Sequence, residues 1–140
     1  MKPMQIVKTI FLKAPPSHVW RFLTEKDKLA IWFHAGEADL EKGGDYAMLT
    51  NSLGREGTRM VTGKVLEFDP PKKLVHTFTH KGLDNVETTC TWDLVEAEGC
   101  TILTLTHSGW EKLGQKAFEV AANHDTGWDQ HFVRLRHVTR

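Results

Sequence analysis

The sequence has 140 residues, a length that suits one globular domain whose core needs no metal or disulfide to hold it together. Hydrophobic residues make up 40% and charged residues 26% of the chain, which excludes disordered, collagen-like and membrane-embedded proteins. The 18 basic residues balance the 18 acidic ones, so no overall field favours nucleic acid or anionic lipid as a partner, and we expect a single domain over residues 1–140.

The first predicted elements are a strand and two short helices. Apolar and polar residues nearly alternate over residues 4–13, which is the period of a strand. Pro15 and Pro16 end that strand, and proline is tolerated in the first turn of a helix because its missing N–H has no helical partner there. One short helix is therefore predicted through residues 19–23, and a second, weaker one through residues 29–33.

The middle of the chain, residues 36–108, has the two-residue period of strands. Groups of turn residues divide it, and they predict about six further strands joined by hairpins. These groups lie at residues 42–45, 51–54, 69–72, 81–85 and 96–99. Together with the first strand, the pattern predicts an antiparallel sheet of about seven strands.

One hairpin can be registered from the sequence. If residues 96–99 form its turn, Trp92 pairs with Leu103, and the apolar side chains of both strands fall on one face while threonines fall on the other. The same register puts Cys90 and Cys100 on opposite faces and several pairs apart. No disulfide is therefore expected between these two cysteines.

A long amphipathic helix is predicted over residues 112–138, with a possible break near Gly114. Its inward stripe consists of Ala117, Ala121, His124, Trp128, Phe132 and Leu135. Trp128 is expected to face Trp92 across the core. Gly127 lowers helix propensity, so we expect it to admit a close neighbour or to mark a bend. The basic residues near the end of the helix complement its dipole.

One strand, two short helices, about six strands and a long helix follow one another in the order that the helix-grip fold uses. The chain resembles the helix-grip (START-like, SRPBCC) superfamily, and within it the bacterial relatives of the C-terminal domain of the activator of the ninety-kilodalton heat-shock chaperone ATPase. The resemblance implies an α+β fold in which the sheet curls round the long C-terminal helix. It implies no single activity, because the superfamily includes ligand carriers, cyclases and chaperone activators. The residues that carry it are Ile10, Ala14-Pro15, Val19-Trp20, Leu23-Thr24, Trp32-Phe33, Gly43-Gly44, residues 63–71 (GKVLEFDPP), Leu74, residues 101–105 (TILTL), Gly127-Trp128 and Leu135.

Large aromatic side chains are the main candidates for a binding site. Together they could line a cavity between sheet and helix, with His124 as a polar contact, although any one of them could simply fill the core. The candidate ligand-binding residues are Trp32, Phe78, Trp92, Trp110, Phe118, His124 and Trp128.

The histidines and acids give no strong catalytic or metal signal. His124 and His131 are seven residues apart, about 10 Å along a helix axis, which is too far to share one metal ion without further ligands. Asp125 and Asp129 point in different directions and are expected to be surface acids. The sequence contains no GxSxG, P-loop, dinucleotide-binding or CxxC motif. We therefore expect no metal and no cofactor, and we assign no catalytic residue.

Three functions remain open. The first is binding of a hydrophobic or aromatic small molecule in the cavity. The second is an enzyme of the polyketide cyclase type that uses the same cavity. The third is an interaction module that contacts a chaperone as its partner. The N-terminus has no apolar run of signal-peptide length, so we expect a cytoplasmic protein that binds neither membrane nor nucleic acid.

Overall fold

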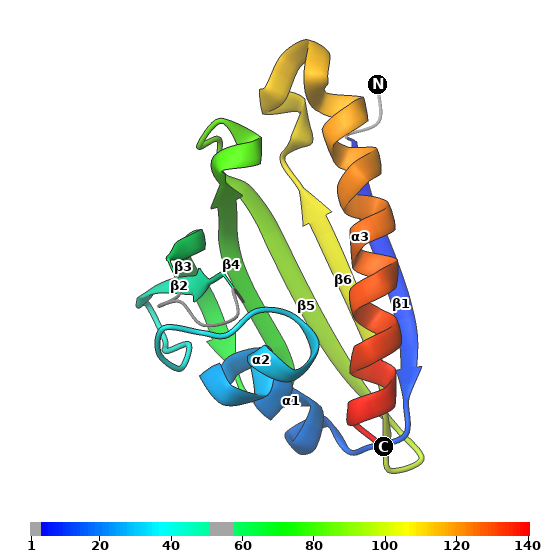
Figure 1. The fold of residues 1–140 in the computed structure, drawn as a ribbon. Helices are drawn as coiled ribbons and strands as arrows, with labels where there is room; N and C mark the ends of the chain where they lie inside the picture. Colours follow the sequence, from blue (N-terminus) through cyan, green and yellow to red (C-terminus); the bar gives the residue numbers. More distant parts are fainter. Residues whose placement is uncertain (1–3, 51–57) are drawn as a thin grey trace.

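The computed structural model describes residues 4–50 and 58–140. It has the predicted α+β architecture, with one antiparallel sheet in the strand order β1-β6-β5-β4-β3-β2 (Figure 1). The strands are β1 (Gln5–Leu12), β2 (Asp45–Leu49), β3 (Arg59–Asp69), β4 (Lys73–His80), β5 (Thr88–Ala97) and β6 (Cys100–Ser108). The helices are α1 (Pro16–Thr24), α2 (Lys26–Trp32), the 3-10 helices η1 (Lys81–Leu83) and η2 (Trp110–Lys116), and α3 (Ala117–Val138).

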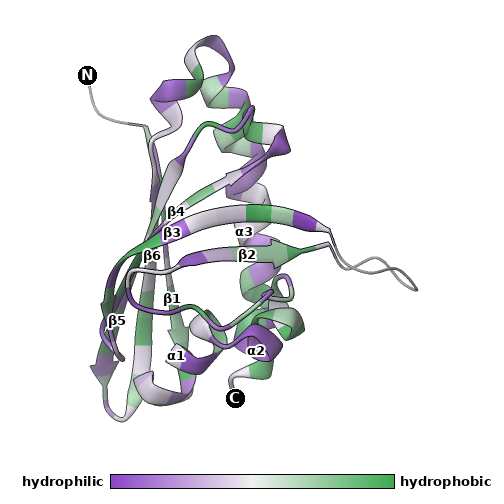
Figure 2. Ribbon diagram, turned by 90° about the vertical axis from the view of Figure 1, so that its left-hand side faces the viewer, coloured by the Kyte–Doolittle hydropathy of each residue, from purple (hydrophilic) through white to green (hydrophobic). Residues whose placement is uncertain are grey.

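The long helix α3 lies along one face of the sheet, beside β1 and β6 (Figure 1). Helices α1 and α2 lie near the C-terminal end of α3, whereas η1 and η2 lie at its N-terminal end. The turned view shows β2 and β3 running across the molecule in front of α3 (Figure 2). No described helix is long and apolar enough to cross a membrane.

Within residues 4–50 and 58–140 the sheet has six strands where the sequence predicts about seven, because residues 36–42 do not form a strand. Gly36 forms an isolated bridge to Met48, and its N–H donates to the carbonyl of Lys26 at 3.2 Å. The Leu40 N–H donates to the carbonyl of Thr24 at 2.8 Å. This segment therefore ties α1 and α2 to β2. The turn expected at residues 51–54 lies outside the described residues.

The β5–β6 register differs by two positions from the prediction. Trp92 pairs with Leu105 rather than with Leu103, because the turn has only two central residues. These are Glu98 and Gly99, with φ of 54° and 81°, the left-handed pair of a type I′ turn. A shift of two leaves every side chain on its predicted face, since the side-chain period is two. The structure thus keeps the predicted apolar face.

The cysteines agree with the predicted separation. Cys90 is completely buried on the core face of β5, and Cys100 is partly exposed at the start of β6. Both are free thiols. Burial raises the pKa of the Cys90 thiol well above its ordinary value, so this sulfur is an apolar core group.

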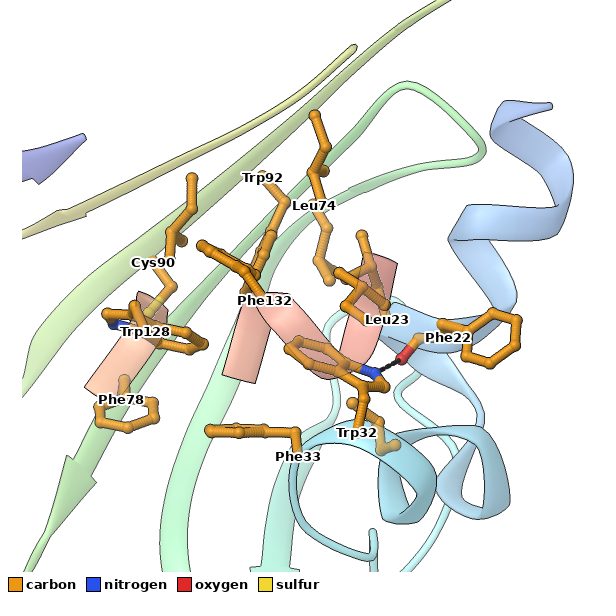
Figure 3. Close-up of a cluster of buried hydrophobic side chains, with 14 of the residues drawn as sticks. Phe22, Leu23, Trp32, Phe33, Leu74, Phe78, Cys90, Trp92, Trp128 and Phe132 are labelled. Carbon is orange, nitrogen blue, oxygen red and sulfur yellow. Dashed lines mark hydrogen bonds between the residues drawn. The ribbon is translucent and has the colours of Figure 1, made fainter. Parts of the chain in front are cut away.

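Aromatic rings from four elements meet between the sheet and α3 (Figure 3). Trp92 of β5 and Trp128 of α3 lie edge to face with ring centroids 5.6 Å apart, which confirms that they face each other. Phe132 stacks beside Trp128 at 5.6 Å, and Trp32 of α2 contacts both Trp92 and Phe132. Such offset and edge-to-face contacts add to the stabilisation that burial alone supplies.

The break before α3 and the buried stripe along this helix were both predicted from the sequence. Gly114 has φ of 63° and ψ of −126°, and this non-helical residue kinks the chain within η2, shortly before α3 begins, at the predicted break. Five members of the predicted inward stripe are buried, and the sixth, His124, is half-buried. The helical phase was therefore predicted correctly.

Candidate functional site

A partly enclosed cavity of about 220 Å³ lies between β3 and β4 on one side and α3 on the other, closed at one end by the residues that follow α2. Its apolar wall consists of Phe33, Met60, Val61, Phe78 and Trp128. Its polar wall consists of His34, His80, Asn123, His124 and His131. The lining thus combines aromatic rings with imidazoles and contains no carboxylate, lysine or cysteine among the described residues.

The predicted site residues divide into those that line the cavity, those that lie in the core, and the exposed Phe118. Phe78, His124 and Trp128 line the cavity. Trp32, Trp92 and Trp110 are at most 3% exposed and lie in the core outside the cavity, so for these three core filling is the correct alternative. The indole N–H groups of Trp32 and Trp110 are used internally, donating to the carbonyls of Phe22 and His107 at 2.8 and 2.9 Å.

The placement of Phe118 at the cavity is wrong. Its side chain is 74% exposed on the outer side of α3. Successive helix residues are about 100° apart, so a residue directly after the buried Ala117 points away from the sheet. Phe118 instead borders a shallow groove beside the start of β1, together with Val7.

Gly127 opens the cavity rather than admitting a close neighbour. A Cβ atom at this position would meet no atom within 4 Å. Gly127 lies among the lining residues contributed by α3, one position before Trp128. The expectation of a close neighbour is therefore incorrect, and the missing side chain leaves space that belongs to the cavity.

His80 of β4 and His124 of α3 are hydrogen-bonded to each other through their Nε2 atoms at 2.8 Å. The Nδ1 of His80 accepts the backbone N–H of Gly82 at 3.0 Å, so its proton is on Nε2. The Nδ1 of His124 donates to the carbonyl of Val120 at 2.8 Å, so its Nε2 is an acceptor. These partners fix one tautomer for each ring, and both rings are neutral.

His107, outside the cavity lining, anchors Trp128. The Trp128 indole N–H donates to Nδ1 of His107 at 3.0 Å, so His107 carries its proton on Nε2. That Nε2 donates to the Thr88 hydroxyl at 2.8 Å, and the hydroxyl donates to the carbonyl of Phe78 at 2.7 Å. The chain of bonds joins α3, β6, β5 and β4, and it fixes the orientation of the Trp128 ring in the cavity wall.

His76 supports the adjacent core. The Trp92 indole N–H donates to Nε2 of the buried His76 at 2.9 Å. The protonated Nδ1 of His76 then faces the Tyr46 hydroxyl at 3.0 Å and the Thr77 carbonyl at 2.9 Å. Burial lowers the pKa of His76 to about 4, which keeps the ring neutral.

The cavity histidines have lowered pKa values. Burial is the main cause for His34, His80, His124 and His131, because an apolar environment disfavours the imidazolium form. The pKa of His131 falls to about 4, through burial and then through the Arg134 guanidinium. Neutral imidazoles of this kind offer hydrogen bonds, but they are weak general bases at neutral pH.

Arg134 contacts the cavity residue His131 but does not itself line the cavity. Its Nε donates to the carbonyl of Trp32 at 3.1 Å, and its guanidinium donates to Nδ1 of His131. These bonds hold the guanidinium against His131. The guanidinium also lowers the pKa of His34, after burial.

Among the described residues, neither a metal-binding cluster nor a pair of acids lining the cavity is found. No group of three or more His, Cys, Asp and Glu side chains that could hold a metal ion occurs in residues 4–50 and 58–140. Asp125 and Asp129 are largely exposed and both pair with Lys8 of β1, at 2.8 and 2.9 Å. They tie α3 to β1 and do not line the cavity.

Sequence reasoning missed several lining residues. His80 continues the inward two-residue phase of Leu74, His76 and Phe78, so the strand pattern could have found it. Gly127 and His131 follow His124 at the spacing of one helix face. Phe33 and His34 follow the end of α2 in irregular backbone, for which no periodic signal exists.

The comparisons with known proteins agree with this fold. A family model described as "Activator of Hsp90 ATPase homolog 1-like protein" matches residues 13–140. No curated protein matches the sequence significantly. The solution structure of the Aha1 dimer from Colwellia psychrerythraea has 21% identity and a TM-score of 0.76, covering 97% of this chain and 96% of that one.

Two further structures are similar. The crystal structure of CalU16 from Micromonospora echinospora has 22% identity and a TM-score of 0.74, and the match covers 97% of this chain and 74% of CalU16. PFC0360w, an HSP90 activator from Plasmodium falciparum, has 23% identity and a TM-score of 0.62, with 75% of this chain and 72% of that chain covered. At these identities the structures establish the shared fold.

Proposed function

The chain belongs to the family of Activator of Hsp90 ATPase homolog 1-like proteins, and we propose that it binds a small apolar or aromatic molecule in the cavity between the sheet and α3. The observation that carries this proposal is the cavity of about 220 Å³, with aromatic rings on one wall and neutral imidazoles on the other. Such a lining is typical of sites that enclose an apolar ligand and orient it with a few polar groups.

The volume limits the size of the ligand. A cavity of about 150 Å³ holds benzene, whereas drug-sized ligands occupy about 300–1,000 Å³. The present cavity, at about 220 Å³, therefore suits a molecule of one ring or two fused rings. Phe33 and Trp128 stack nearly parallel at 5.1 Å and supply a flat apolar surface for it.

His124 has a different role from the one predicted from the sequence. Both of its ring nitrogens already have partners, Val120 and His80. A direct hydrogen bond to the ligand would require one of these bonds to break. We therefore assign His124 to the wall, where it holds β4 against α3.

Binding is favoured over cyclase-type catalysis by the chemistry of the wall. An enzyme of that type needs a placed acid or base with a pKa near the working pH. Among the described residues that line the cavity, the titratable side chains are four histidines with lowered pKa values. These groups supply hydrogen bonds more readily than proton transfer.

A protein-contact role like that of the Hsp90 activators is the second candidate. On the outer face of the sheet, Phe11 pairs with Ile102, and Ile102 pairs with Val95. Phe11 is 70% exposed and Val95 58% exposed, so this row forms an apolar strip across three strands. Exposed apolar patches on a soluble domain are typical of contact surfaces.

A titration with p-xylene followed by NMR tests the proposed function. We expect shift changes at Phe78, Gly127 and Trp128, the residues that line the cavity on β4 and α3. The outer strip, with Phe11 and Val95, serves as the internal control and should not change. No change at millimolar p-xylene, or changes confined to the outer strip, would contradict the proposal.

A further inference from the structure

Several polar atoms of the cavity wall are engaged within the protein. His80 and His124 use both ring nitrogens, as described above. The Nδ1 of His131 accepts from Arg134. A ligand that bonded these atoms would first have to displace a protein partner.

His34 differs from these three histidines. Its Nδ1 atom is buried, and it has no hydrogen-bond partner among the residues that the structure describes. The ring belongs to the cavity lining. A buried polar atom without a partner is unfavourable, so a ligand atom that bonds it gains more than one that only contacts the apolar wall.

The position of His34 connects this atom to the aromatic wall. Its ring centroid is 4.6 Å from that of Phe33, and Phe33 in turn stacks on Trp128. A ligand ring that packs on this wall therefore lies beside His34. Nδ1 is covered in this structure, so the His34 ring must turn toward the cavity before a short substituent on the ligand ring can bond it.

The charge near His34 restricts the substituent. The Arg134 guanidinium is close enough to oppose an additional positive charge, and it lowers the pKa of His34 together with burial. A cationic amine is therefore disfavoured. The Nδ1 of a neutral imidazole donates in one tautomer and accepts in the other. A hydroxyl group can donate and accept, so it bonds Nδ1 in either case.

We infer that the ligand of this cavity is a neutral phenol of one or two rings, whose hydroxyl group is hydrogen-bonded to Nδ1 of His34. This inference rests on the proposed function, since it requires that the cavity binds an aromatic molecule at all. It adds a specific recognition residue and a chemical class of ligand. The ring packs on Phe33 and Trp128, and the hydroxyl group points to His34.

Two probes of nearly equal shape test the inference. In p-cresol a hydroxyl group replaces one methyl group of p-xylene. The dissociation constants of both are measured by NMR titration for the native protein and for His34→Phe, which keeps a flat ring without nitrogen. We expect the ratio of the p-cresol affinity to the p-xylene affinity to fall about tenfold in the variant, the usual value of one buried hydrogen bond.

The outcomes separate the two proposals. If neither probe binds the native protein, the proposed function fails and the inference fails with it. If both probes bind but His34→Phe leaves the ratio of the two affinities unchanged, the inference alone is overturned. His34→Leu provides a second variant should His34→Phe not fold. His34→Asn keeps a polar atom near the position of Nδ1 and should restore part of the preference for p-cresol.

Discussion

The Nε2 atoms of His80 and His124 lie 2.8 Å apart, and the hydrogen bond between them joins β4 to α3 at the wall of the cavity. The backbone partners of the two Nδ1 atoms, at Gly82 and Val120, fix which ring donates. The bond requires a neutral His124 ring, because a proton on its Nε2 would put two N–H groups face to face. The contact between sheet and helix therefore depends on pH.

The first prediction is a double-mutant cycle on this pair. At a pH of about 7.5, His80→Ala and His124→Ala should each destabilise the protein, and the two changes should be coupled by about 1 kcal/mol, the net value of one buried hydrogen bond. Urea unfolding of the four proteins measures the coupling. The coupling should decrease as the pH falls through the lowered pKa of His124, because a proton on its Nε2 removes the bond in the native protein too. Strict additivity at the higher pH would show that the pair contributes nothing.

The second prediction concerns stability and pH. The pKa values of the buried histidines are lower in the folded state than in the unfolded state, so the unfolded state binds more protons as the pH falls. The stabilisation from the neutral histidines is fully present above the unfolded pKa, near 6.5, and it is lost as the pH falls toward the folded pKa. For His76 and His131 the folded pKa is about 4. We expect the free energy of unfolding to fall by about 2 kcal/mol for the buried His76 alone between pH values of about 7 and 5. His76→Gln should show a smaller decrease, and a flat profile over this range contradicts the prediction.

The third prediction compares two phenylalanines. Phe78 is 4% exposed and lines the cavity, whereas Phe118 is 74% exposed. Phe78→Ala should destabilise by about 3 kcal/mol or more and weaken p-xylene binding, because it removes both packing and a wall. Phe118→Ala should change the free energy of unfolding by less than about 0.5 kcal/mol and leave binding intact. Equal effects of the two substitutions would contradict the assigned orientation of α3.

The fourth prediction concerns Trp128. Trp128→Ala should destabilise by about 3–5 kcal/mol, because the ring is only 3% exposed and packs against Trp92 and Phe132. Trp128→Phe keeps a ring but loses the bond to His107, and we expect a smaller loss of about 1–2 kcal/mol. Val133→Ala, at a position that is 70% exposed, is the control on the same helix. If the alanine variant at Trp128 is no less stable than this control, the packing described for the core is wrong.

The sequence predicted those features that depend on periodicity. The inward phase of α3, the break at Gly114 and the facing of Trp92 and Trp128 all follow from helix and strand periods, and the structure confirms them. The β5–β6 register was missed by two because Glu98 adopts a left-handed conformation. Glutamate is not a typical residue for that position, so no local signal marked the short turn.

The candidate site was only partly predictable for a related reason. Phe78, His124 and Trp128 lie on regular elements, and their inward direction could be read from spacing. His34 lies in irregular backbone after α2, and residues 36–42 bond to α1 and β2 instead of forming a strand. Tertiary contacts decide such positions, and a single sequence does not encode them in any period. The polar residue that we assign to ligand recognition therefore became visible only in the structure.

The measurement that tests the central claim most directly is p-xylene binding to two variants of Gly127, where a Cβ meets no atom within 4 Å. Gly127→Ala should stabilise α3 by up to about 1 kcal/mol and leave the dissociation constant within about threefold of the native value. Gly127→Leu places an isobutyl group in the cavity, and it should weaken binding more than tenfold while the protein stays at least as stable as the native one, since an apolar side chain fills an apolar space. If the folded leucine variant binds p-xylene as tightly as the native protein does, the aromatic ligand does not occupy this cavity and the proposed function is wrong.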